Sequence, residues 1–432
     1  MKINKALLAA ILAVGGSGFL LQAADAQVLD SLRNRTKSKD KQDPTQQTQQ
    51  PRRTALQGLE PAESAAVMPL YQAVQAQDWP TAQAALPAAR AGATTPAGRY
   101  LVAQLTLEIG RGTQNVEMQG DAVDAMVASG GAPAELMPQL LSIQADRAVA
   151  ANNLPLAESA LTRVIELDPN NVARIRQLAQ VKNALNKKQE ALTLYRRAIQ
   201  LSETGGQRAP EDMMRGALAI AYEARQLQPS LELGRALVTA YPSPANWRSA
   251  LRIYRELAGS DPGLALDLRR LMRAAGALES ERDFVEYADD ANSAGLPGEA
   301  KAVLEEAFSG NRITTAQTYA RNLLTLVDAR IAEDRAALPG LRTRALAPGG
   351  SGREARVTGD VYYSYGQYAD AATLYRAALQ KGGEDPNLVN TRLGAALAMG
   401  GQRAEAETAF RAITGPRSEL AQFWLMWLAT RG

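Results

Sequence analysis

The chain has no cysteine and no histidine among its 432 residues. Without these residues it cannot form a Ser-His-Asp or Cys-His catalytic arrangement, a thiol redox centre or an ordinary zinc site. The absence of cysteine also excludes disulfide bonds and a lipid-modified cysteine behind an export signal. Any catalysis would therefore depend on carboxylates alone, as in the cleavage of glycosides.

Aromatic residues are also scarce, at 5% of the chain, and no series of segments alternates apolar with polar residues. Both absences argue against a β-sandwich, because strands are enriched in aromatic side chains and have a period of two. Alanine, leucine, arginine, glutamine and glutamate are abundant instead. Since these residues favour helices, the composition predicts an all-α fold.

Neither charge sign is in large excess. The chain has 48 Lys and Arg against 45 Asp and Glu, a formal net charge of +3. A dedicated nucleic-acid binder would carry a stronger basic balance. We therefore expect no nucleic-acid partner.

Two pairs of adjacent carboxylates are the candidates for acid–base chemistry, Asp289-Asp290 and Glu305-Glu306. Adjacent side chains on a helix point about 100° apart, so neither pair forms a facing acid–base couple. We therefore expect no catalytic residue, no cofactor and no metal site. A polysaccharide-processing enzyme that uses carboxylates is the least favoured hypothesis.

One short segment recurs along the chain. It is a turn-like stretch that closes on an alanine, with a large apolar residue four positions later and a small or aliphatic residue seven positions later. Because these positions share one helix face, each segment predicts a helix–turn–helix unit with alanine at the helix crossing. The six segments are Gln77–Ala82, Asn152–Ala157, Asn186–Ala191, Gly295–Ala300, Gly366–Ala371 and Gly401–Ala406.

The spacing of these segments is typical of a known repeat. Ala157 and Ala191 lie 34 residues apart, and Ala371 and Ala406 lie 35 apart. A period of about 34 residues is that of the tetratricopeptide repeat. Residues 353–383 match several positions of that repeat in one register, namely Gly359, Tyr362, Gly366, Tyr368, Ala371, Tyr375 and Ala378. The next unit matches at Leu393, Gly394, Gly401, Ala406 and Phe410.

The chain thus resembles the tetratricopeptide repeat family, most closely at its C-terminus and least between residues 205 and 280. The resemblance implies an all-α, right-handed superhelical solenoid of antiparallel helix pairs. We expect this repeat region to cover residues 61–345, with a divergent part at 205–280. A loop at 347–352 separates it from a C-terminal repeat pair with a capping helix at 353–432.

The N-terminus predicts export. Lys2 and Lys5 precede an apolar stretch, and Ala24-Asp25-Ala26 forms a small-x-small cleavage site. This pattern is typical of a secretory signal peptide over residues 1–26. A membrane anchor is the alternative, but the apolar stretch is short and interrupted by glycines. No later apolar run is long enough to span a bilayer, so we expect a periplasmic protein, or else a secreted one.

Residues 27–60 are polar and rich in glutamine, lysine and arginine. Such a segment cannot bury enough apolar surface to offset the entropy of ordering, so we predict a flexible linker. Its basic residues between Arg33 and Arg53 could alternatively contact anionic lipid or polymer.

The family resemblance also implies where a ligand would bind. Polar residues on the first helices of the repeats normally face the concave groove of the solenoid. Guanidinium and amide donors there suit an extended peptide or a carboxylate, although the same residues could simply be solvated. The candidates are Arg176, Gln180, Asn183, Arg282, Asp289, Asn292, Arg353, Arg356, Asp360, Tyr363 and Arg392.

One variant of this groove is not expected. Asp360 and Leu388 stand where the family's carboxylate clamp has asparagine and lysine. Recognition of chaperone tails is therefore not predicted.

The C-terminal segment from Ser418 to Arg431 carries Phe423, Trp424 and Trp427. A terminal repeat needs a cap over its open face, and this segment predicts such a helix. The alternative is a docking surface for a partner or for a second copy of the chain.

The sequence thus favours a non-catalytic scaffold of the bacterial cell envelope that binds a protein or peptide of unknown identity. The alternative is an accessory factor in exopolysaccharide or envelope biogenesis.

Overall fold

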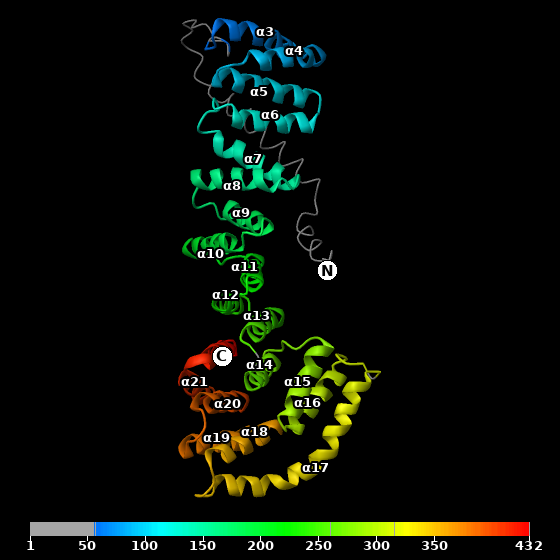
Figure 1. Ribbon diagram of the computed structural model, residues 1–432, viewed down its shortest axis with the longest axis vertical. Helices are drawn as coiled ribbons and strands as arrows, with labels where there is room; N and C mark the ends of the chain where they lie inside the picture. Colours follow the sequence, from blue (N-terminus) through cyan, green and yellow to red (C-terminus); the bar gives the residue numbers. More distant parts are fainter. Residues whose placement is uncertain (1–55, 57, 260, 315, 432) are drawn as a thin grey trace, which may run out of the picture. The chain divides into compact units, whose positions relative to one another are not determined.

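The computed structural model describes residues 56, 58–259, 261–314 and 316–431, which contain helices and no strands (Figure 1). This confirms the all-α prediction. The predicted signal peptide and nearly all of the predicted linker lie outside the described residues. The chain divides into two compact units between Leu185 and Asn186.

Unit 1 is built from helix pairs in which α3 packs on α4, α5 on α6 and α7 on α8. Most of these helices begin at a side-chain cap, such as Asn153, whose oxygen accepts a hydrogen bond from the Leu156 N–H. The helices are α3 Pro61–Gln75, α4 Trp79–Gly92, α5 Pro96–Gly112, α6 Val116–Ala128, α7 Met137–Ala150, α8 Leu154–Leu167 and α9 Val172–Ala184.

Unit 2 contains the remaining helices and the C-terminus. One of them, α17, has 29 residues, about twice the length of its neighbours, and departs from the repeat. The elements are α10 Lys188–Thr204, α11 Glu211–Glu223, α12 Leu227–Ala240, α13 Pro244–Leu257, α14 Pro262–Ala274, α15 Glu281–Ser293, α16 Pro297–Ser309, α17 Thr318–Leu346, α18 Gly352–Ser364, α19 Tyr368–Lys381, α20 Pro386–Met399, α21 Arg403–Arg411, η2 Gly415–Arg417 and α22 Ser418–Ala429.

The six recurring segments adopt one turn geometry. Their first residues all have a positive φ, between 54° and 78°, a conformation that glycine and asparagine adopt most readily. Their closing alanines are all 0% exposed. The residues four and seven positions later are buried as well. The structure therefore confirms the register inferred from the sequence. The six turn residues are Gln77, Asn152, Asn186, Gly295, Gly366 and Gly401.

Two repeats pack an aromatic ring of the second helix against a glycine of the first. A Cβ atom on Gly359 would lie 2.8 Å from the Tyr375 ring, and one on Gly394 would lie 2.5 Å from the Phe410 ring. Real side chains do not tolerate such distances, so the glycines are required for these helices to approach. This explains why the repeat is clearest at the C-terminus.

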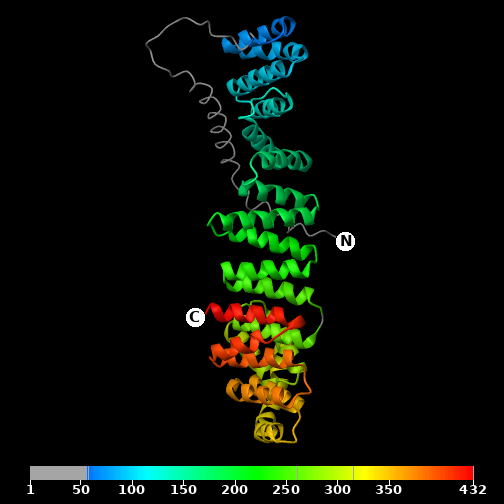
Figure 2. The same cartoon turned by 90° about the vertical axis from the view of Figure 1, so that its left-hand side faces the viewer.

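The divergent region between residues 205 and 280 forms regular helices and receives the end of the chain. Helix α22 lies beside α13 and α14 in both views of the ribbon (Figures 1 and 2). The Phe423 ring centroid lies 6.1 Å from those of both Trp247 and Tyr254. The Trp427 Nε1–H donates to the carbonyl oxygen of Ala274 at 3.0 Å. The chain from α14 to α22 therefore closes on itself.

The structure decides between the two roles considered for the C-terminal helix. Phe423 and Trp424 are 0% exposed and Trp427 is 5% exposed, all within unit 2. These side chains are not available as a contact to a second copy, so their burial favours the predicted cap over the alternative of a docking surface. They are part of the core of unit 2, where α22 covers the surface of α13.

A buried carboxylate stands where the chain closes. Asp267 on α14 is 2% exposed. Its Oδ2 atom accepts from Arg417 Nη1 at 2.7 Å, and its Oδ1 atom accepts from Arg270 Nη1 at 3.2 Å. The Nε atom of Arg392 lies 3.6 Å from the same Oδ1. Asp267 thus joins α14 to α20 and to the turn before α22.

A second buried carboxylate continues this ion network on α18. Asp360 accepts from the Tyr375 hydroxyl at 2.8 Å and from Arg356 Nη1 at 3.0 Å, and it also pairs with Arg392. Burial lowers the pKa of Arg392, but Asp360 and Asp267 outweigh it and raise this pKa above its ordinary value. The Arg392 guanidinium is therefore charged in the folded state.

The alanine register gives a first test. We expect Ala371→Leu to lower the free energy of unfolding by about 1–3 kcal/mol, because the larger side chain overpacks a fully buried helix crossing. The measurement is urea unfolding of the full chain, followed by circular dichroism. The matched control is Ala369→Leu, which adds the same side chain at an exposed position of α19. Equal midpoints for the two variants would contradict the register.

The closing carboxylate gives a second test. Asp267→Asn should destabilise the protein by about 3–5 kcal/mol, since it leaves buried guanidinium groups without their counter-charge. Glu405→Gln is the control, because Glu405 pairs with Arg376 at the surface and both are exposed. Thermal unfolding should show a large shift for the first variant and little for the second. An unchanged melting temperature for Asp267→Asn would show that the network does not hold unit 2 closed.

Candidate functional site

Unit 2 contains an open cavity of about 560 Å³. Its wall comes from α14, α15, α16 and α17, and from α18, α19, α20 and the C-terminal segment with α22 and Arg431. Its volume lies in the range of about 300–1,000 Å³ that is usual for ligand pockets. Because these helices are far apart in the sequence, the closure of unit 2 creates the cavity.

Buried charged groups form one part of this wall. Arg270 Nε and Nη2 donate to the two Glu299 oxygens at 2.8 and 2.7 Å, and the Tyr287 hydroxyl donates to Glu299 Oε1 at 2.7 Å. The Arg270 guanidinium lies over the Tyr363 ring, 4.4 Å from its centroid. Burial raises the pKa of Glu299, but Arg270 and Tyr287 outweigh it and hold this pKa below its ordinary value. Glu299 therefore stays ionised, and the Arg270 guanidinium balances its charge.

More exposed ion pairs also line the cavity. Arg273 Nε donates to Glu306 Oε2 at 2.7 Å, and Lys301 Nζ lies 3.4 Å from Glu305 Oε1. Lys301 also pairs with Asp328 on α17. All three carboxylates in the cavity wall, Glu299, Glu305 and Glu306, therefore have a cationic partner.

Two arginines of the wall lie over aromatic rings instead. The Arg335 guanidinium carbon is 5.0 Å from the centroid of the Tyr365 ring, and that of Arg431 is 4.5 Å from the Trp427 ring. Arg431 Nη2 also donates to the carbonyl oxygen of Ala274 at 3.2 Å. Among the described residues, neither guanidinium is paired with a carboxylate.

The Tyr365 ring under Arg335 is held in place. Its hydroxyl donates to Asp334 Oδ2 at 2.6 Å. Burial, followed by this hydrogen bond and the charge of Asp334, raises the pKa of Tyr365 above its ordinary value. The ring therefore stays neutral and keeps its orientation.

The carboxylates considered for catalysis are engaged in structural contacts. Asp289 accepts from the Tyr319 hydroxyl at 2.7 Å, and Asp290 Oδ2 accepts from Arg269 Nε at 2.5 Å. Glu305 and Glu306 are paired as described above. Within the described ranges, no group of three or more acidic residues is placed to hold a metal ion. All four carboxylates are thus engaged in contacts within unit 2.

The predicted groove residues fall in three places. Arg176, Gln180 and Asn183 lie on α9 in unit 1, where Gln180 is exposed and the other two are partly buried. They share one helix as expected. The other predicted site residues all lie in unit 2.

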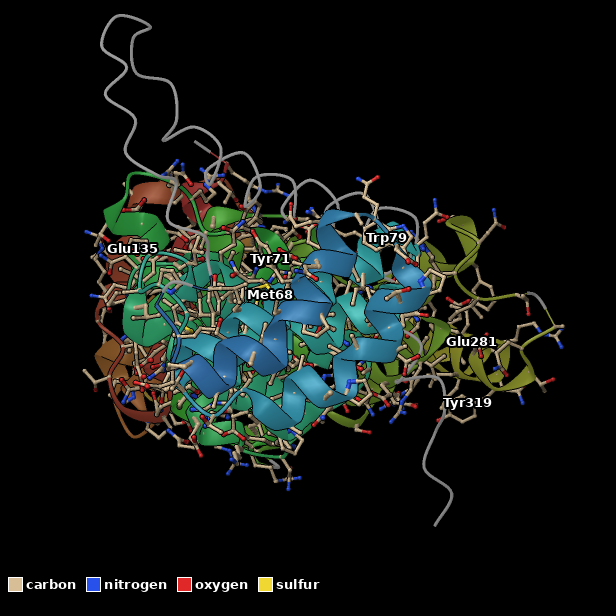
Figure 3. All side chains as sticks on the ribbon, turned by 90° about the horizontal axis from the view of Figure 1, so that it is seen from above. Met68, Tyr71, Trp79, Glu135, Glu281 and Tyr319 are labelled. Atoms are coloured by element: carbon tan, nitrogen blue, oxygen red, sulfur yellow. The ribbon has the colours of Figure 1, made fainter. Side chains whose placement is uncertain are left out.

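The second set lies on α15. Arg282 is 83% exposed and pairs with Glu286 on its own helix. Asp289 accepts from Tyr319, and Arg330 Nη1 donates to Asn292 Oδ1 at 3.4 Å, so α17 lies against this face. Figure 3 labels Glu281 at the start of α15 and Tyr319 at the start of α17, on the same side of the unit.

The third set requires a correction. Asp360, Tyr363 and Arg392 are buried, and Arg356 is mostly buried in pairs with Asp360 and Glu384. They do not line an open groove, because the returning chain places α14 with Asp267 and Arg270 against them. Only Tyr363 reaches the cavity wall. Arg353 is exposed at the start of α18.

Arg335, Tyr365 and Arg431 were not predicted as site residues. No local pattern marks them. Arg335 lies on the non-repeat helix α17, and Arg431 follows the C-terminal cap. Their convergence depends on ring closure, which is a property of the tertiary structure.

Across the described part of the chain, no helix is both long enough and apolar enough to cross a membrane.

Comparisons with known proteins found no matching family model and no matching curated protein. Similar solved structures include a tetratricopeptide repeat protein from Parabacteroides merdae ATCC 43184, at 14% identity over 60% of this chain and 99% of that chain, with a TM-score of 0.31. Another is Naa15/Naa10 bound to HypK-THB, at 11% identity over 83% of this chain and 63% of that chain, with a TM-score of 0.37.

The fold class therefore rests on the geometry of this chain. The left-handed turn residues, the buried alanines and the helix pairs recur in one register along both units. The described chain is therefore an all-α solenoid of tetratricopeptide-like helix pairs.

Proposed function

We propose that the protein is a non-catalytic interaction scaffold that binds a segment of another polypeptide in the cavity of unit 2. The observation that carries this proposal is the pairing of Glu299, Glu305 and Glu306 with cations. A general acid or base needs a proton that it can exchange with a substrate. Carboxylates held in ion pairs are poorly suited to that role, whereas the remaining donors and rings can bind.

The cavity also suits an extended segment by its size and lining. About 560 Å³ accommodates a few side chains but no folded domain. Exposed Met399 and partly buried Ile331 provide apolar surface beside the charged groups. A polypeptide segment offers both apolar side chains and hydrogen-bonding groups, and it matches this mixture.

We further propose that the scaffold works in the bacterial cell envelope, in the periplasm. This part of the proposal is supported by the signal-peptide pattern of residues 1–26.

Site-specific photo-crosslinking tests the binding site. Replacing Met399 with p-benzoylphenylalanine places the reactive group in the cavity wall, and the same replacement at Val357 places it at an exposed position outside the cavity. In cells of the native host, we expect a protease-sensitive adduct at position 399 that is absent at position 357. Denaturing gels of the purified full-length protein provide the measurement.

Two outcomes would oppose the proposed site. Equal adducts at both positions would show contact without selectivity. An adduct at position 399 that resists protease and is removed by glycan-degrading enzymes would instead favour the role in exopolysaccharide assembly.

Export can be tested separately. The chain recovered by osmotic shock should begin at Gln27, because the signal peptide is removed after Ala26. N-terminal sequencing and intact mass provide the measurement. The double variant Ala24→Lys, Ala26→Lys is the control and should remain unprocessed. An intact wild-type chain found in the cytosol would contradict the proposed location.

A further inference from the structure

We propose that the cavity of unit 2 selects an acidic peptide segment, whose carboxylates bind to Arg335 and Arg431. This inference rests on the proposed function, since it specifies the chemistry of the polypeptide that the cavity would take.

The first step is the charge balance of the wall. Three of its five cations have a carboxylate partner: Arg270 pairs with Glu299, Arg273 with Glu306 and Lys301 with Glu305. Within the described residues, the other two, Arg335 and Arg431, have none. The wall therefore has two positive charges that its own carboxylates leave unmatched.

The second step is the way in which these two arginines are held. Each guanidinium lies over an aromatic ring, Tyr365 for Arg335 and Trp427 for Arg431. The ring face attracts the cation, and a guanidinium carries its N–H donors around its edge. The rings thus limit the motion of the two side chains. Arg431 Nη2 already donates to the Ala274 carbonyl, and the other edge donors can bind a carboxylate. Such forks bind carboxylates with two parallel hydrogen bonds.

The third step concerns the class of acidic ligand. Glu305 and Glu306 are exposed on α16 and line the same cavity. A polymer with a negative charge on every unit would also place charges beside these carboxylates, where Arg273 and Lys301 are already paired and the described residues offer no unmatched cation. A peptide can place isolated acidic side chains at Arg335 and Arg431 and apolar groups against Ile331 and Met399. The mixed wall therefore favours an acidic peptide over a polyanion.

Fluorescence anisotropy with defined probes tests this inference. The probes are fluorescein-labelled peptides in which one to four leucine or alanine residues separate two glutamates, with matched peptides in which glutamine replaces glutamate. We expect at least one glutamate peptide to bind the full-length protein, with an affinity about tenfold higher than that of its glutamine match. Raising the salt concentration from about 0.05 M to about 0.5 M should weaken this binding.

The variants Arg335→Gln and Arg431→Gln should each weaken binding by about threefold to tenfold, and the double variant by more. Both residues are exposed, so the variants should keep the wild-type melting temperature. The matched control is Arg321→Gln, which removes an exposed arginine of α17 that is not part of the cavity wall. It should leave peptide binding unchanged.

Three results would overturn the inference. They are equal binding of the glutamate and glutamine peptides, no binding by any glutamate peptide, and loss of binding that is the same in Arg321→Gln as in the two cavity variants. Oligogalacturonate is the polyanion control. If it binds through the two arginines while the peptides do not, the ligand class is wrong. Protein crosslinking at position 399 without these arginine effects would refute the acidic preference and leave the proposed function intact.

Discussion

The return of α22 onto the middle of the chain is the contact on which unit 2 depends. Phe423 packs against Trp247 and Tyr254, and Trp427 donates to Ala274, so the last helix covers surface that a simple tandem array would expose. Local repeat contacts alone do not bring α14 and α20 together. The apolar contact supplies association, because aromatic side chains bury large areas.

The buried carboxylate Asp267 restricts how the two ends of unit 2 can meet. It is shared by Arg270, Arg417 and Arg392, which come from three separate parts of the chain. Buried ion pairs often contribute little net stability, since desolvation offsets their attraction. Their geometric requirement is stricter than that of an apolar patch, however, and a misplaced helix would leave buried charge unpaired. We infer that the aromatic contact drives closure and that the ion network fixes its register.

Contacts within one repeat are predictable from the sequence, whereas contacts between distant segments are not. Gln77, Asn152 and Gly366 mark their turns through backbone conformation, and Ala371 marks its crossing through a fixed spacing, so the repeat could be read directly. Asp360 and Arg392 have the helix positions of groove residues, but their burial depends on a segment far along the chain. No short-range pattern predicts such a contact.

The same reasoning explains why the cavity depends in part on the least regular segments of unit 2, beside helices of the repeat itself. Identical repeats present similar groups at every step, so a unique site needs elements that break the pattern. Helix α17 provides Arg335 because it is a long non-repeat helix, and the C-terminal segment provides Trp427 and Arg431 because it turns back instead of continuing the array. Closure thus gives unit 2 a cavity that its repeated helix pairs alone would not form. Ligand binding would in turn stabilise closure. A ligand that bridges α17 and the C-terminal segment would bind the closed form better than an open one and would therefore favour it.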